Sequence, residues 1–294
     1  MLEFLNPTER LGYTQSTKLL IIHADDFGLA QSENAATIMA LEQGSVNSSS
    51  IMVPCAWFPE SAAYSKAQPA ADLGIHLTLT SEWTYYRWRP VLPAHEVPSL
   101  VDEQGFLHDS VEKLSRYATL PDIEKELRAQ IERGKQFGIA PTHLDSHMFG
   151  LVAKPEFLTV YLKLGREFGL PLLLNRDFIL RTAGYDIRPY ITDQYLLVDY
   201  LYSAEPQDYE AGMISFYTKT LQNLQPGLSV VLLHPAYNNA EMQAITVDHP
   251  YWAADWRQYD VDFFTSPACQ KILEEQQIQL ITWREIRDKL STET

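Results

Sequence analysis

The chain has 294 residues, of which 46% are hydrophobic, enough for a sizeable core in one large domain. Its 23 Lys and Arg residues against 38 Asp and Glu residues give a formal net charge of −15. Such a surface repels phosphate backbones and anionic lipid, which excludes nucleic acid and membranes as expected partners. With only Cys55 and Cys269, no secreted disulfide framework is expected. The chain has no apolar signal core and no membrane-length apolar run, so we expect a cytoplasmic location.

The first predicted element is a buried strand that begins at Leu19 and ends in a pair of acidic residues. Its apolar run is followed by His23-Ala24-Asp25-Asp26-Phe27-Gly28. The adjacent acids must leave the core, so they lie at the rim, where α/β folds place their chemistry. Their mutual repulsion is costly unless they share a cation or a proton. The motif therefore indicates a metal or acid–base site, with a solvated turn as the alternative.

Strands and helices then alternate along the chain. Further strands are predicted at residues 46–53, 73–80, 142–147, 171–175, 195–200, 229–234 and 279–283. Helices are predicted at residues 31–43, 57–67, 121–138, 155–168, 209–224 and 266–276. About eight strands in this alternation predict one α/β domain over residues 1–294, a TIM-like (β/α) barrel whose closure is left open. A doubly wound sheet is the alternative, but no Gly-rich phosphate loop follows the first strand.

Residues 81–120 break this pattern. The segment carries Trp83, Tyr85, Tyr86 and Trp88 together with several prolines, and it has no clear periodicity. We expect a long insertion after the third strand that lies over the mouth of the barrel.

Polar residues recur near the ends of the predicted strands. They are Asp25 and Asp26 after the first strand, His76 in the third, His143, Asp145 and His147 in the fourth, Arg176 after the fifth and His234 at the end of the seventh. The two-residue period of a strand puts Ile75 and Leu77 on one face and His76 on the other, towards the barrel axis. The same period aligns the three polar residues of the fourth strand.

Each of these residues also has a purely structural interpretation. A lone strand histidine such as His76 is often a hydrogen-bonded core residue, and Arg176 suits an ion pair. His143 lies deeper in the barrel and is the more structural of its pair, while Asp145 suits orientation of a ligating imidazole. Their convergence at one rim nevertheless favours a site, because two imidazoles and a carboxylate can hold a divalent cation with open positions.

Four ordered motifs make the chain resemble a known family. They are Ala-Asp-Asp-Phe-Gly, Gly-Ile-His-Leu-Thr-Leu, Pro-Thr-His-Leu-Asp-Ser-His and a late His-Pro. In these motifs the chain resembles the YdjC-like carbohydrate deacetylases, typified by the chitooligosaccharide deacetylase. The resemblance runs from about Lys18 to Leu290.

The resemblance implies a role for each motif residue. Asp26, His76 and His147 would bind one divalent metal ion, Mg²⁺ or Zn²⁺. Asp25 would be the general base, and His234 matches a late histidine that would serve as general acid. The implied reaction is metal-dependent hydrolysis of the acetyl group of an N-acetylated amino sugar or oligosaccharide.

Substrate contacts are expected from Arg176, Trp83 and Tyr85, because aromatic rings suit stacking on sugars; a hydrophobic lid is the alternative for the aromatic residues. The sequence departs from the family twice. His23 stands where asparagine is common, and Met148-Phe149 follows His147 where many members carry further histidines. A carbohydrate-binding or regulatory protein without turnover is therefore an alternative, and a glycosidase is a weaker one. The sugar, its chain length, the acyl group and the oligomeric state, including a homodimer, are left open.

Overall fold

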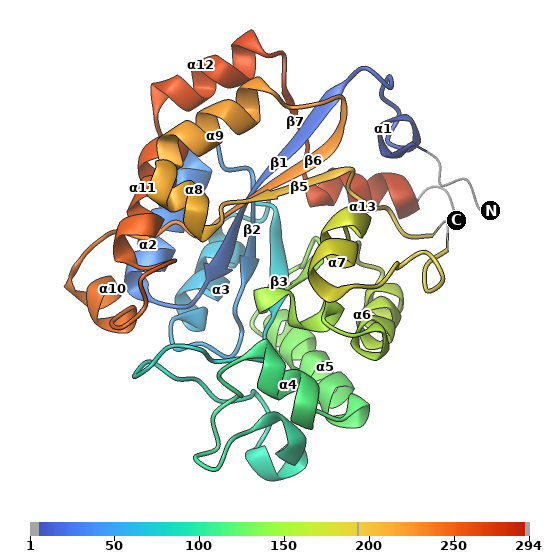
Figure 1. Cartoon of the computed structure of the whole chain (residues 1–294). Coiled ribbons are helices and arrows are strands. Elements are labelled where there is room, and N and C mark those ends of the chain that lie inside the picture. Colours follow the sequence, from blue (N-terminus) through green and yellow to red (C-terminus); the bar gives the residue numbers. More distant parts are fainter. Residues whose placement is uncertain (1–5, 193, 292–294) are drawn as a thin grey trace.

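The computed structural model describes residues 6–192 and 194–291, and a curved parallel sheet forms its centre (Figure 1). The strands are β1 (Lys18–Phe27), β2 (Ser48–Ile51), β3 (Leu73–Leu77), β4 (Leu144–Ser146), β5 (Tyr200–Ser203), β6 (Gly227–Leu233) and β7 (Gln279–Leu280). Their hydrogen-bonded order is β4-β3-β2-β1-β6-β5, with β7 also paired to β1, and every pair is parallel. The predicted α/β class with a parallel, barrel-like sheet is therefore confirmed.

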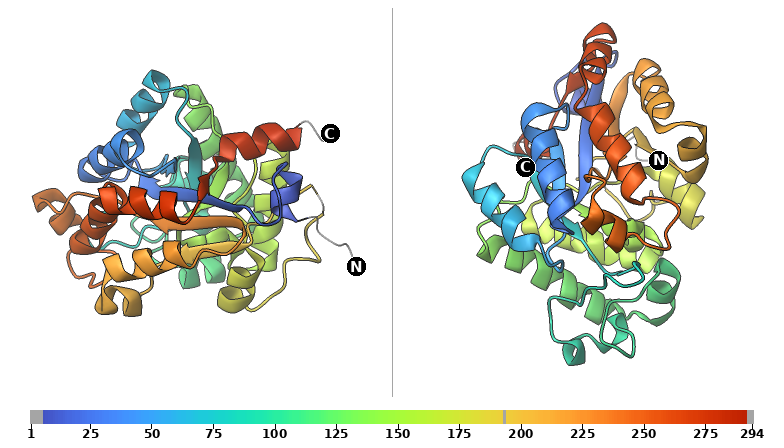
Figure 2. Two further views of the ribbon diagram at one scale, coloured as in Figure 1. Left: turned by 90° about the horizontal axis from the view of Figure 1, so that it is seen from above. Right: turned by 90° about the vertical axis from the view of Figure 1, so that its left-hand side faces the viewer.

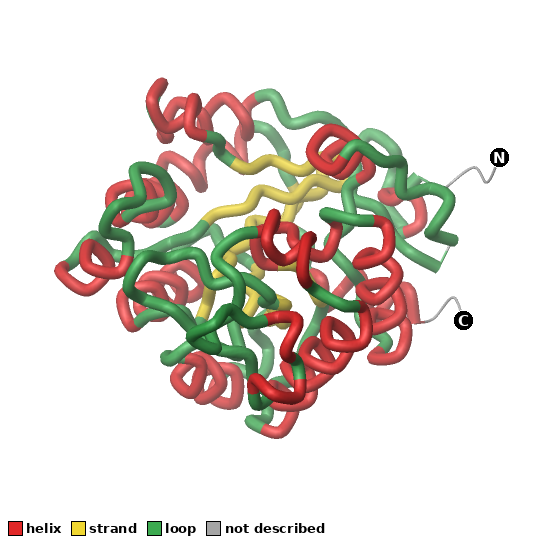
Figure 3. The backbone as a smooth tube through the Cα atoms, turned by 60° about the horizontal axis from the view of Figure 1, so that its bottom comes forward, coloured by secondary structure: helices red, strands yellow, loops and turns green. Residues whose placement is uncertain are grey.

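Helices surround this sheet on its outer side (Figure 3). They are α1 (Pro7–Arg10), α2 (Gln31–Gln43), α3 (Phe58–Ala67), α4 (Val111–Tyr117), α5 (Leu120–Gln136), α6 (Pro155–Phe168), α7 (Arg176–Ala183), α8 (Pro206–Ala211), α9 (Met213–Gln222), α10 (Ala240–Ile245), α11 (Ala254–Phe264), α12 (Pro267–Glu275) and α13 (Trp283–Ser291). Three 3₁₀ turns are η1 (Ala94–Glu96), η2 (Pro98–Leu100) and η3 (His147–Val152). None of the described helices is both long and apolar enough to cross a membrane.

The strand ladder does not close into a complete barrel within the described residues. Between β4 and β5, the predicted strand at residues 171–175 is reduced to a single bridge between Leu144 and Leu172. The predicted strand at residues 195–200 is also wrong, because regular pairing begins only at Tyr200. Leu196 and Val198 do point into the core, but Val198 donates only one backbone hydrogen bond across the gap, to Leu174. The alternation of apolar residues thus predicted correctly that these side chains are buried, but it predicted wrongly that their backbone pairs as a strand.

Several helices also differ from the predictions. The helix predicted at residues 209–224 is divided into α8 and α9 at Gly212, whose φ of 112° suits glycine and interrupts the helix. The predicted strand at residues 279–283 is shorter, because Trp283 already begins α13. Helices α7 and α11 were not predicted. Asn175 caps α7 immediately after the predicted fifth strand, which hid the helix start.

The outer and inner faces of β1 pack in two different apolar clusters. Leu20, Ile22 and Ala24 pack outwards in one cluster with residues of α9, α11 and α12. Leu19 and Ile21 point into the barrel interior, where they join residues from β6 and α13. This inner apolar cluster, which we call the lower barrel interior, consists of Leu11, Leu19, Ile21, Leu173, Leu196, Val198, Leu228, Val230, Leu232, Ile281, Trp283 and Ile286.

Opposite ends of the barrel are covered by different parts of the chain. At the amino ends of the strands, α1 lies beside α13, and Lys289 Nζ is 4.5 Å from the ring centroid of Tyr13 (Figure 2). At the carboxyl ends, residues 81–120 continue from β3 and fold back on the barrel. There the Tyr86 hydroxyl donates to the Leu29 carbonyl at 2.6 Å, and Trp88 Nε1 donates to the Thr80 carbonyl at 2.8 Å. Tyr86 and Trp88 thus anchor this segment.

Candidate metal and catalytic site

The end of β1 is distorted so that both adjacent acids face one site. Side chains alternate on a regular strand, but the pairing of β1 with β2 slips between Ala24 and Phe27. Asp26 takes a φ of 66°, which non-glycine residues seldom adopt. As a result, Asp25 Oδ1 lies 3.9 Å from His76 Nδ1, and Asp26 Oδ1 lies 3.5 Å from His76 Nε2.

Three buried ligand atoms converge beyond this bulge. His147 Nδ1 lies 3.3 Å from Asp26 Oδ1 and 3.2 Å from His76 Nε2, and His76 Nε2 lies 3.5 Å from Asp26 Oδ1. Ligands about 2.1 Å from a tetrahedral or octahedral cation are themselves about 3.0–3.4 Å apart. Asp26 Oδ1 is also fully buried without a hydrogen-bond partner in the described part of the chain. The three residues therefore fit a divalent cation.

The far side of each imidazole is held by a carboxylate. His76 Nδ1 lies 2.9 Å from Asp145 Oδ1, and His147 Nε2 lies 2.9 Å from Glu82 Oε1. Carboxylates only accept, so these nitrogens carry the hydrogen, and a neutral ring then presents a lone pair to the shared centre. This is the usual arrangement of histidines that ligate metals.

The same carboxylates strengthen proton binding when no cation is bound. Although burial lowers it, the charges of Glu82 and Asp26 raise the pKa of His147 to about 10. Burial also lowers the pKa of His76, but the charges of Asp145 and Asp25 outweigh it, so that this pKa is raised overall. A cation must therefore displace protons, and we expect metal binding to release protons and to weaken at low pH.

Arg257 of α11 holds the second oxygen of Asp26. Its guanidinium donates to Asp26 Oδ2 at 3.0 Å and to Glu33 Oε2 at 2.6 Å, and all three side chains are buried. Burial favours the neutral acid, but the neighbouring His147 and the charge of Arg257 lower the pKa of Asp26 well below its usual value. Asp26 is thus kept ionised, with Oδ1 turned towards the two histidines.

Asp25 and His234 face each other beside the three ligand atoms. Asp25 Oδ2 lies 3.7 Å from His234 Nε2, at the end of β6. The backbone N–H of His234 donates to Asp260 Oδ2 at 2.8 Å, which fixes the start of this loop. Burial lowers the pKa of His234, against the opposing charges of Asp26 and Asp25. Two titratable groups that could move protons therefore lie next to each other, beside the three ligand atoms.

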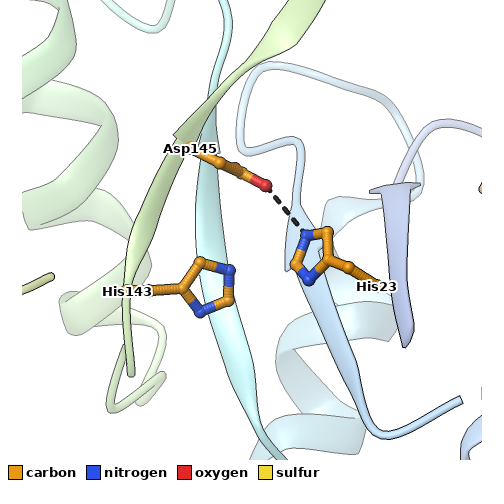
Figure 4. Close-up of side chains that lie close together, drawn as sticks. All are labelled: His23, His143 and Asp145. Atoms are coloured by element: carbon orange, nitrogen blue, oxygen red, sulfur yellow. Dashed lines mark hydrogen bonds and ion pairs between the residues drawn. The ribbon is translucent and has the colours of Figure 1, made fainter. Parts of the chain in front are cut away.

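A further polar layer consists of His23, His143 and Asp145, whose side chains lie close together (Figure 4). His23 Nε2 lies 2.9 Å from Asp145 Oδ2, and the rings of His23 and His143 meet edge to face at 5.0 Å. His143 Nδ1 pairs with Thr142 Oγ1 at 3.0 Å, and burial lowers the pKa of His143 well below its usual value. His143 is therefore neutral, and its hydrogen bond goes to Thr142 instead of to any of the three ligand residues.

The three residues expected to contact substrate lie in different surroundings. Arg176 forms a two-pronged ion pair with Asp186, at 3.1 and 3.2 Å. Tyr85 is 78% exposed, whereas Trp83 is buried with its ring centroid 5.5 Å from the Arg257 guanidinium carbon. Of these three, Trp83 packs directly against a residue that holds the site, and substrate binding by all three stays a prediction.

Glu82 and Arg257, which hold His147 and Asp26, were not predicted from the sequence. Glu82 lies in an aperiodic segment, where only its position between the third strand and the aromatic run was a signal. Arg257 lies in a helix whose apolar pattern was not recognised, because α11 is buried on more than one side: Trp256, Phe263 and Arg257 itself are all inaccessible.

The chain is similar to known proteins in both sequence and structure. The profile of the YdjC-like protein family matches residues 19–275. A carbohydrate deacetylase of Thermus thermophilus is 32% identical over 296 residues, covering 96% of this chain and 98% of that protein. A chitooligosaccharide deacetylase of Serratia marcescens is 28% identical, covering 92% and 99%. A crystal structure from Enterococcus faecalis, provisionally named a cellobiose-phosphate cleavage protein, superposes with a TM-score of 0.77 at 27% identity, covering 92% and 99%. The chain belongs to the YdjC-like protein family.

Proposed function

We propose that this protein is a metal-dependent hydrolase that removes the acetyl group from an N-acetylated amino sugar or oligosaccharide. The observation that carries the proposal is the convergence of Asp26 Oδ1, His76 Nε2 and His147 Nδ1 within 3.5 Å of one another, beside the facing pair Asp25 and His234. The printed names of the relatives, carbohydrate deacetylase and chitooligosaccharide deacetylase, support the reaction class.

Asp26, His76 and His147 would hold the cation. A divalent ion there supplies Lewis-acid polarisation of a carbonyl oxygen and lowers the pKa of water. Around it the protein's own groups have fixed tasks. Asp145 and Glu82 hold the two rings with their lone pairs inwards, and Arg257 keeps Asp26 ionised. The residues thus offer a preorganised set of ligands in a dry environment.

Asp25 and His234 would move the protons. Asp25 Oδ2 accepts the proton of the attacking water, while its other oxygen, Oδ1, is held by buried groups beneath it. His234 Nε2 delivers a proton to the departing amine nitrogen, without which the C–N bond breaks only slowly. Because the two groups lie 3.7 Å apart, an acetamide group placed beside the pair would be within reach of both.

We also propose that residues 81–120 form an insertion that closes over the substrate side of this single-domain barrel. The segment brings Glu82 to His147 and Trp83 to Arg257, so it takes part in building the site.

The direct test is acetate release from a panel of N-acetylated mono- and oligosaccharides, with the protein metal-loaded, chelated and reloaded with Mg²⁺ or Zn²⁺. The proposal expects acetate release that disappears on chelation and returns with a divalent ion. Hydrolysis of glycosidic bonds that survives chelation would support a glycosidase instead. Sugar binding by the metal-loaded protein with no acetate released across the panel would support a binding protein without turnover.

A further inference from the structure

His23 lies on the inward face of β1, one inward position below Asp25 and one above Ile21. Its side chain is completely buried. Its ring makes polar contacts with Ser48, Ser50 and Asp145, and with Asp25 of the site above. None of the three proposed metal ligands is among these contacts in the part of the chain that the structure describes.

One ring nitrogen of His23 serves two carboxylates. His23 Nε2 lies 2.9 Å from Asp145 Oδ2 and 3.2 Å from Asp25 Oδ1. Both oxygens can only accept when ionised, so Nε2 must carry a hydrogen, which it donates to Asp145 and which also lies close to Asp25. The other nitrogen, Nδ1, lies 2.9 Å from Ser48 Oγ, which prevents the ring from turning. The donor is therefore fixed in place.

The bond to Asp145 joins His23 to the proposed metal ligand His76. Asp145 uses Oδ2 for His23 and Oδ1 for His76 Nδ1, at 2.9 Å each. Ser50 Oγ lies 3.1 Å from His76 Nδ1 and 3.5 Å from Asp25 Oδ1, and so closes the arrangement from β2. Asp25 and His76 are thus the two ends of one buried chain of contacts, Asp25–His23–Asp145–His76.

We propose that His23 is a positioning residue for hydrolysis, which holds the Asp25 carboxylate in register with the cation site by linking it to Asp145. The inference rests on the proposed function for the role of Asp25 as base. Two buried carboxylates beside each other also need a positive partner. Although burial lowers it, the hydrogen bonds to Asp145 and Asp25 raise the pKa of His23 to about 10, so the ring can supply that charge.

A near-isosteric pair of variants isolates the shared hydrogen. His23→Gln keeps an N–H donor at nearly the same reach, whereas His23→Met has a similar volume and no donor. We expect His23→Met to lower kcat by roughly 10²-fold, because a misplaced base loses most of its benefit, with KM and metal affinity changed less than about threefold. His23→Gln should recover kcat to within about tenfold of the parent protein.

His143→Met is the matched control. It also removes a buried imidazole from the barrel, but His143 pairs with Thr142 and contacts neither Asp25 nor His76 by a hydrogen bond in the described residues. We expect this variant to lose stability and to keep kcat within a few-fold. Equal kcat values for His23→Gln and His23→Met, or an equal loss in His143→Met, would overturn the proposal in favour of a merely structural role.

A second readout does not depend on turnover. In crystal structures of the metal-loaded proteins, Asp25 should turn away from its parental position in His23→Met and stay in place in His23→Gln. An unmoved Asp25 in His23→Met would overturn the proposal, even if the parent released no acetate and the proposed function had failed. If His23→Met does not fold, Ser48→Ala takes its place: it frees the ring at Nδ1 and should lower kcat several-fold, and an unchanged kcat would count against the proposal.

Discussion

The lower and upper halves of the barrel interior share strands β1 and β6 but differ in chemistry. In the lower barrel interior, β1 and β6 contribute Leu19, Ile21, Leu228 and Val230. Further along, β1 carries His23, Asp25 and Asp26, and His234 follows β6, while β2, β3, β4 and η3 contribute only to the upper half. We define the upper half as His23, Asp25, Asp26, Ser50, His76, Asp145, His147 and His234. On β1 the two-residue period holds from Leu19 to Asp25, so residue type divides the two halves there, and only Asp26 owes its place to the distorted end of the strand.

The two halves contribute to the protein in opposite ways. Each fully buried Leu or Val in the lower half stabilises the fold by about 1.5–3 kcal/mol. In the upper half, burial of charge is costly and is tolerated only where partners compensate. The upper half meets this condition nearly everywhere, and Asp26 Oδ1 is the buried oxygen within it that has no hydrogen-bond partner in the described residues. Apolar packing in the lower half therefore stabilises the fold, whereas the upper half is a preorganised polar site in which Asp26 Oδ1 lacks a partner.

The largest effect is expected from loss of a ligand in the upper half. His147→Ala removes Nδ1 from the group of three and should abolish detectable metal binding and turnover. Titration of the metal-stripped protein with Zn²⁺ in a calorimeter measures this directly. Retained stoichiometric binding would show that His147 is not a ligand.

Asp25→Asn separates the base from the ligands. Because Asp25 is not one of the three converging residues, metal affinity should stay largely intact while kcat falls roughly 10²-fold or more. Acetate release and metal titration on the same preparation provide the two readouts. Comparable metal loss in Asp25→Asn and His147→Ala would mean that base and ligand were misassigned.

His234→Ala tests the opposite side of the site. Burial lowers the pKa of His234, so its acid form is lost as pH rises through a value below the usual histidine value of about 6.5. A nearby cation disfavours the protonated ring in the same direction. The pH profile of kcat/KM should therefore have an alkaline limb that begins on the acid side of neutrality, and His234→Ala should lack that limb and be roughly 10²-fold slower at the optimum. An alkaline limb that persists in the variant would assign the acid role elsewhere.

Glu82→Ala sharpens the comparison at the edge of the upper half. The variant leaves His147 in place but removes the carboxylate that holds Nε2, so metal affinity should weaken by about 10- to 100-fold. Glu82→Gln, whose amide oxygen can still accept from Nε2, should lose less. If both variants bind metal as tightly as the parent, Glu82 does not orient His147.

The smallest effect on activity is expected in the lower half. Leu228→Ala leaves a cavity beside Leu19, to which it is paired in register, and should lower the free energy of unfolding by about 2–5 kcal/mol. At a temperature where the variant is folded, kcat should stay within a few-fold of the parent value. Denaturant unfolding and acetate release together check this. A large kcat loss with intact folding would show that the two halves are not separable.

Much of the fold was predictable because strand and helix signals were local. The run from Leu19 to Asp26 gave β1 and its rim, and helices at residues 31–43 and 155–168 matched α2 and α6 in both bounds. The irregular side between β4 and β5 was not predictable. There, apolar alternation at residues 195–198 reports burial, whereas a strand also requires a neighbour with a matching row of hydrogen-bonding groups.

The site was predictable where its residues lay at strand ends and not where they came from other elements. The two-residue period and the parallel direction of the strands predicted that their polar residues would meet at one rim. The residues that do meet there are Asp25, Asp26, His76, His147 and His234. The contributions of Glu82 and Arg257 depend on how residues 81–120 and α11 pack on that rim. Packing over so many intervening residues leaves no local pattern in the sequence.

The most direct test of the account is an anomalous difference map from crystals of the protein loaded with Zn²⁺. We predict one strong peak at about 2.0–2.3 Å from Asp26 Oδ1, His76 Nε2 and His147 Nδ1 together. Asp25 should lie beside the ion without joining these ligands. A peak held by other residues, or no peak at full Zn²⁺ loading, would contradict the claim that the upper barrel interior is built around a metal ion.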